Sequence, residues 1–95
     1  MASTFWHDRH VLVTGGTSGI GLAATRLLVE LGARVSAIGV TAQAVGALQD
    51  EALPGVVALR ADVSDPAQVA EAVAAARATH GPVRSLVTSA GITRP

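Results

Sequence analysis

The stretch Val11–Gly21, which reads VLVTGGTSGIG, restricts the fold of this chain more than any other part of the sequence. It starts with a short apolar run rich in β-branched residues, which predicts a buried β-strand. Four glycines within seven residues follow. The apolar residues after them recur with the period of an α-helix: Ile20, Ala23, Ala24, Leu27, Leu28 and Leu31. The predicted order is therefore strand, glycine-rich turn, helix.

The glycines of this turn predict an anion-binding site. Gly15 allows the chain to leave the strand with backbone angles that other residues avoid. Gly19 has no side chain to hold a phosphate away from the first helical turn, and Gly21 allows close packing of helix and sheet. Free N–H groups and the positive end of the helix dipole then face one point, which suits a pyrophosphate. A tight turn without a ligand is the alternative, although a plain turn needs only one glycine.

The segment Thr14–Gly21 resembles the TGxxxGxG cofactor motif of the short-chain dehydrogenases/reductases. Members of that family have a Rossmann fold and use NAD or NADP to oxidise alcohols or reduce carbonyls. The resemblance extends from about Asp8 to the last residue. It implies cofactor contacts from six residues of the turn: Gly15, Thr17, Ser18, Gly19, Ile20 and Gly21.

Apolar periodicity and capping residues predict four strands in alternation with three helices, which indicates a parallel α/β sheet. Thr41 and Asp65 are the expected N-caps, with Gln68 in the position of a capping-box partner for Asp65. The resemblance implies a partial Rossmann (doubly wound) fold with strand order 3-2-1-4. The first two helices would cover one face and the third the other. The predicted strands are 11–13, 34–38, 56–60 and 85–88, and the predicted helices are 19–31, 42–52 and 66–80.

Asp62 and Val63, just past the third strand, resemble the Asp-Val pair that contacts adenine in this family. The resemblance implies that the carboxylate accepts from the adenine amino group and that the next backbone N–H meets a ring nitrogen. The position fits, because open α/β sheets bind ligands at the carboxyl ends of their strands. A loop aspartate that only caps a turn is the alternative.

The end of the second strand bears on the choice between NAD and NADP. NAD enzymes usually place Asp or Glu here, about 20 residues past the glycine loop, to bind the ribose hydroxyls. This chain has Gly39 there, which we expect to contact the cofactor. Val40 follows, where NADP enzymes of the family often carry Arg. Because an acid would repel a 2′-phosphate and none is present, we expect a weak preference for NADP over NAD. Thr41 and the N-terminus of the following helix could take that phosphate weakly.

The end of the chain resembles a third motif of the family. Thr88–Gly91 reads TSAG, where the family has NNAG after the fourth strand. Thr88 replaces the first Asn, which ties that strand to its neighbours. The resemblance implies that Ser89, Ala90 and Gly91 lie against the nicotinamide ribose, where only small residues fit.

Composition predicts one small globular domain. The 95 residues are 49% hydrophobic and 15% charged, and the formal net charge is zero. No basic stripe predicts a nucleic-acid or membrane partner, there is no cysteine, and no apolar run has the length of a signal peptide or membrane span. We therefore expect a cytoplasmic protein. Trp6 is expected to pack at the bottom of the sheet, and His7 and His10 to be solvated without a metal.

The chain has no tyrosine, lysine or asparagine. The family's chemistry needs a Tyr as acid/base, a Lys that lowers its pKa, and a Ser, often with an Asn. We therefore expect residues 1–95 to be the N-terminal portion of a single NAD(P)-binding domain, truncated after the fourth strand and inactive by itself. The missing C-terminal half or another chain would cover that strand. A non-catalytic dinucleotide-binding module and an interaction module are the alternatives.

Overall fold

The computed structural model describes residues 4–89, in which strands and helices alternate as predicted. β1 extends one residue beyond the prediction at each end, and α1 and α2 each stop one residue earlier. The elements are β1 (His10–Thr14), α1 (Gly19–Glu30), β2 (Arg34–Gly39), α2 (Ala42–Glu51), β3 (Val56–Arg60), α3 (Pro66–His80) and β4 (Ser85–Thr88).

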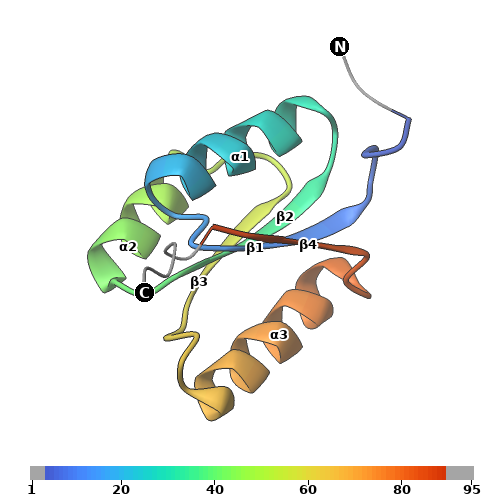
Figure 1. Ribbon diagram of the computed structural model, residues 1–95. Coiled ribbons are helices and arrows are strands. Elements are labelled where there is room, and N and C mark those ends of the chain that lie inside the picture. Colours follow the sequence, from blue (N-terminus) through green and yellow to red (C-terminus); the bar gives the residue numbers. More distant parts are fainter. Residues whose placement is uncertain (1–3, 90–95) are drawn as a thin grey trace, which may run out of the picture.

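The four strands form one parallel sheet in the order β3-β2-β1-β4, as predicted (Figure 1). Val13 of β1 lies opposite Ala37 of β2 on one side and Val87 of β4 on the other. The sheet is therefore doubly wound, because β1 and β2 are central and the chain turns outward in both directions from them. All strand carboxyl ends lie at the same edge, where loops from different parts of the chain meet.

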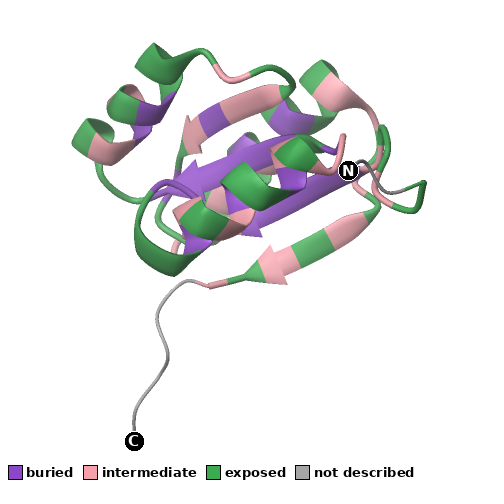
Figure 2. Cartoon of the chain, turned by 90° about the horizontal axis from the view of Figure 1, so that it is seen from above, coloured by how far each residue is buried: buried purple, intermediate pink, exposed green. Residues whose placement is uncertain are grey.

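Two apolar cores lie on the two faces of the sheet. α1 and α2 cover one face and α3 the other, as predicted (Figure 1). Neighbouring strand residues point to opposite faces, so Val11 and Val13 enter the first core while Leu12 enters the second. Figure 2 shows the buried residues concentrated in the central strands, with β4 only partly covered.

The helix caps agree with the sequence except at one position. Thr41 Oγ1 accepts from Ala44 N at 3.1 Å, and Asp65 Oδ1 accepts from Ala67 N at 3.0 Å. The predicted capping box between Gln68 and the Asp65 backbone is wrong. Asp65 N already donates to the carbonyl of Asp62 at 2.9 Å, so Gln68 Oε1 accepts from Asp62 N instead.

The prediction that His10 is solvated is also wrong. His10 is only 2% exposed, because β1 starts there and its side chain points to the α3 face. Its Nδ1 lies 2.9 Å from the Gly81 carbonyl oxygen and its Nε2 lies 2.7 Å from Ser36 Oγ. His7 is exposed as predicted, and Trp6 is partly buried against the α1 and α2 core.

None of the helices within residues 4–89 is long and apolar enough to cross a membrane. The same residues contain no group of three or more His, Cys, Asp or Glu side chains arranged to hold a metal ion.

Candidate functional site

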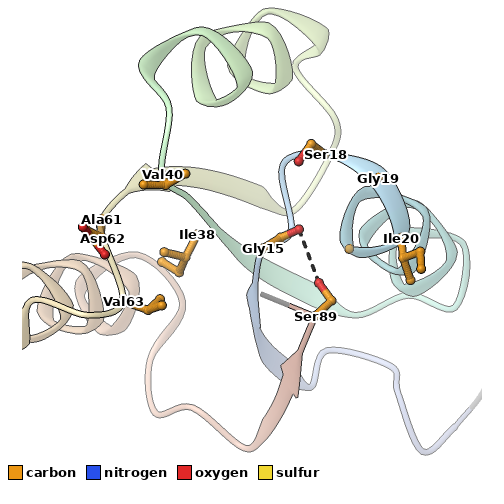
Figure 3. A pocket seen from close by; sticks show the side chains of 11 residues that line it. Gly15, Ser18, Gly19, Ile20, Ile38, Val40, Ala61, Asp62, Val63 and Ser89 are labelled. Carbon is orange, nitrogen blue, oxygen red and sulfur yellow. Dashed lines mark hydrogen bonds between the residues drawn. The ribbon is translucent and has the colours of Figure 1, made fainter. Parts of the chain in front are cut away.

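A cleft of about 640 Å³ opens at the carboxyl ends of β1, β2 and β3, where the glycine-rich turn meets the loop after β3 (Figure 3). Its walls come from four segments that are distant in sequence. The lining residues are Gly15, Ser18, Gly19, Ile20, Gly21, Ile38, Val40, Ala61, Asp62, Val63 and Ser89. Eight of these eleven are among the residues that the resemblance implied as cofactor contacts.

The glycine-rich turn has the backbone geometry that the sequence predicts. Gly15 and Gly19 have φ angles of 71° and 55°, in the left-handed region that favours glycine. Gly21 is required for a different reason, since a Cβ there would overlap the carbonyl oxygen of Gly15 and the Ser89 hydroxyl. α1 therefore begins directly against the end of β1, without a side chain between them.

The start of α1 leaves polar main chain facing the cleft. Ser18 is the N-cap residue with an extended backbone, but its side chain forms no capping hydrogen bond. The first turn carries no acidic side chain, and a Cβ on Gly19 would meet nothing within 4 Å. Unpaired N–H groups at a helix start attract anions. A phosphate group therefore fits this position in both charge and space.

Asp62 caps a turn and also lines the cleft. Its Oδ1 accepts from Ser64 N at 2.9 Å and from Ser64 Oγ at 2.7 Å, so it does cap a turn. These hydrogen bonds lower the pKa of the Asp62 carboxyl, which keeps it ionised. The turn uses only one carboxylate oxygen, and Asp62 and Val63 both line the cleft. The carboxylate can still accept another donor through Oδ2.

Thr17 and Gly39 lie beneath the cleft and do not line it. Thr17 is 6% exposed, and its side chain fills the space where a Cβ of Gly39 would be. The two residues therefore share one buried volume below the end of β2. We expected cofactor contacts from both residues, and neither of them lines the cleft.

Three further residues that were not expected from the sequence also line the cleft, namely Ile38, Val40 and Ala61. They stand at or just beyond the ends of β2 and β3. A rule that takes every residue at the carboxyl end of a parallel strand could have found them. Val40 is 58% exposed and follows directly on the buried end of β2.

Ser89 connects the end of β4 to the glycine-rich turn. Its Oγ donates to the Thr14 carbonyl at 2.9 Å and lies 3.4 Å from the Gly15 carbonyl, the second contact being drawn in Figure 3. Ser89 N donates to the same Thr14 carbonyl at 3.0 Å. The predicted contacts Ala90 and Gly91 lie outside the described residues.

The family model described as short chain dehydrogenase matches residues 9–95. Among curated proteins, "Dehydrogenase/reductase SDR family member 11" from Bos taurus is 35% identical over 98 residues and matches 95% of this chain. "Acetoacetyl-CoA reductase" from Synechocystis is 40% identical over 94 residues and matches 99% of this chain. The chain covers 37% and 36% of these two proteins, just over a third of their length.

Solved structures show the same likeness. A short chain oxidoreductase from Pseudomonas aeruginosa PAO1, described as containing an atypical catalytic center, superposes with a TM-score of 0.82 at 35% identity. That match covers 92% of this chain and 35% of the other. A variant short-chain dehydrogenase/reductase from Serratia marcescens gives a TM-score of 0.82 at 30% identity, over 94% and 38% of the two chains.

Proposed function

This chain belongs to the short chain dehydrogenase family, and on that premise we propose that its cleft binds the dinucleotide cofactor of an NAD(P)-dependent oxidoreductase. The reaction class of the family is the interconversion of alcohols and carbonyls. When bound, the nicotinamide supplies or accepts the hydride. The residues of this chain would hold the cofactor and would not act on the substrate.

The observation that carries this proposal is the bare main chain at the start of α1. Ser18 leaves the first N–H groups uncapped, and Gly19 and Gly21 keep side chains away from them. These groups and the helix dipole would bind the pyrophosphate. Gly15 supports the turn from the end of β1. Small neutral residues favour this role because a pyrophosphate needs close approach to the backbone.

The adenosine would occupy the part of the cleft between β2 and β3. Asp62 would accept from the adenine amino group through its free carboxylate oxygen, and the Val63 N–H would donate to the ring. Ile38, Val40 and Ala61 supply apolar surface for the adenine faces. Ser89, with Ala90 and Gly91 beyond it, would lie against the nicotinamide ribose.

We assign the proton-transfer step to residues outside this sequence, because the 95 residues include neither Tyr nor Lys. A phenol that titrates near 10 needs a neighbouring cation to work at neutral pH. The purified chain is therefore expected to bind the cofactor without turning over an alcohol. NADP(H) is the preferred cofactor in this proposal, because no acid stands at the end of β2.

A charge placed at the start of α1 tests the proposal. Ile20 is 82% exposed and lines the cleft in the first turn of the helix. Ile20→Asp should not harm folding, since an acid in this position favours the helix dipole. It should repel the pyrophosphate and weaken NADPH and NADH binding by about tenfold or more, the loss of roughly 1.4 kcal/mol. Titration calorimetry on the purified chain measures the affinity for each cofactor.

The neutral variant Ile20→Asn is the matched control, and circular dichroism should show the same helix content for all three proteins. Ile20→Asn should retain most of the affinity, because it changes shape and polarity without adding charge. If the wild-type chain is folded and gives no saturable signal with either cofactor up to millimolar concentration, the proposal is wrong. If Ile20→Asp and the wild type bind the cofactors equally well, the phosphates do not lie at the start of α1.

A further inference from the structure

The corner between β2 and β3 carries a cation that the sequence motifs do not point to. Arg60 is the last residue of β3 and lies opposite Gly39 in the strand register. Its Nε donates to the carbonyl of Val40 at 3.1 Å. Val40 lines the cleft, so this hydrogen bond holds an arginine side chain at the edge of the adenosine end of the site.

The guanidinium of Arg60 is available for a further partner. Arg60 is exposed, and no carboxylate within residues 4–89 forms an ion pair with it. Arg26 differs, because Glu51 holds both of its terminal nitrogens at 2.7 and 2.8 Å. The Nε bond to Val40 leaves the two terminal NH₂ groups of Arg60 unused. An arginine presents such a pair of donors to the oxygens of a carboxylate or phosphate.

The residues at and just after the end of β2 are neutral. Gly39 has no side chain, Val40 is apolar, and the Thr41 hydroxyl already accepts the capping bond from Ala44. The one acid that lines the cleft, Asp62, is bound to Ser64 on the loop after β3. A dianionic group at the end of β2 would therefore meet the Arg60 guanidinium. No carboxylate within residues 4–89 forms an ion pair with this cation.

We propose that Arg60 is a specificity-determining residue of this chain, which binds the 2′-phosphate of NADP(H) from β3. This rests on the proposed function, since it requires the adenosine to lie between β2 and β3. The family's usual position for such a cation is Val40, and here the Val40 backbone positions the cation instead. A phosphate monoester carries about two negative charges at neutral pH, which favours NADP(H) over NAD(H) at this corner.

Cofactor discrimination by Arg60→Gln tests the assignment. Glutamine keeps a polar side chain of similar reach but removes the charge. We expect NADPH affinity to fall about tenfold, as for loss of a charge-assisted hydrogen bond, and NADH affinity to change less than about twofold. The substitution should likewise lower the affinity for adenosine 2′,5′-bisphosphate and leave that for adenosine 5′-monophosphate nearly unchanged. Arg60→Lys should keep part of the preference, and salt should weaken NADPH binding in the wild type more than in Arg60→Gln.

Arg84→Gln is the matched control. Arg84 is an exposed arginine just before β4, at the opposite edge of the sheet, and its loss should leave both affinities unchanged. If Arg60→Gln binds both cofactors as the wild type does, or weakens both equally, the assignment of Arg60 is wrong while cofactor binding stands. A wild-type chain that prefers NADH also refutes it. If the folded wild type binds neither cofactor, both proposals fail.

Discussion

At the scale of single residues, Thr17 and Gly39 show why the end of β2 lacks the acid that NAD enzymes use. A Cβ on Gly39 would overlap the Thr17 side chain, and Thr17 is itself buried. The two positions are therefore coupled, because only one of them can carry a side chain in this volume. Thr17 in the loop thus limits which residue can stand 22 positions later, at position 39. This is the position where NAD enzymes carry the acid.

Gly39→Asp should destabilise the chain by about 1–3 kcal/mol, because it overpacks a buried site. Thr17→Gly vacates the space, so the double variant should recover part of that loss. The interaction between the two changes, measured by urea unfolding of all four proteins, should be favourable by about 1 kcal/mol or more. Additive effects would mean that the two side chains do not compete for one volume.

At the scale of elements, the end of α3 is attached to the sheet by a buried polar cluster. His10 of β1 connects the Gly81 carbonyl to the Ser36 hydroxyl of β2, and its ring lies 5.1 Å from that of His80 with an edge-to-face angle of 71°. His80 Nε2 is buried and has no hydrogen-bond partner among the described residues. This partly buried site therefore disfavours the charged form of the His80 ring.

Burial lowers the pKa of His80, and repulsion from His10 adds to this. A hydrogen bond with the Val35 backbone opposes these effects, and Arg34 contributes a smaller lowering. The folded chain thus binds this proton less readily than the unfolded chain, whose histidine titrates near 6.5. Stability from neutral His80 is complete above that pH and is lost as pH falls through the lower folded pKa. The free energy of unfolding should therefore decrease on acidification from pH 7 to 5.

His80→Gln should flatten this decrease, and His7→Gln, the same change at an exposed position, is the control. Urea unfolding at several pH values measures the slope for each protein. A slope that is the same in His80→Gln and wild type would assign the pH dependence to other groups.

At the scale of the whole molecule, β4 is an edge built of residues suited to a covered strand. Within residues 4–89 it pairs only with β1, and Figure 2 shows that none of this strand is coloured as buried. Leu86 is 60% exposed. Its free backbone groups and apolar side chains form a template for another strand. We propose that further polypeptide of the same protein or another chain covers this edge.

The purified 95-residue chain should therefore self-associate as concentration rises, and Leu86→Lys should shift it toward the monomer. Leu27→Lys is the control, because Leu27 is similarly exposed, at 55%, but lies on α1 away from the edge. Light scattering coupled to gel filtration gives the mass of each protein. A wild-type monomer at all accessible concentrations, or equal effects of both substitutions, would contradict the prediction.

The sequence by itself determined the alternation of elements, the turn at Gly15 and the family. These features are local, since apolar period, cap residues such as Asp65 and a positive φ at glycine depend on near neighbours. The order β3-β2-β1-β4 followed from the family resemblance and is confirmed.

Only the tertiary structure decided the environment of side chains that meet across strands. Sequence alone could not place His10 beside Ser36, or Thr17 in the space at Gly39, because both pairs depend on strand register and on which face each residue points to. The same holds for Arg60, which reaches Val40 only because β2 and β3 are neighbours. Contacts between residues distant in sequence arise from packing, and no local pattern encodes them.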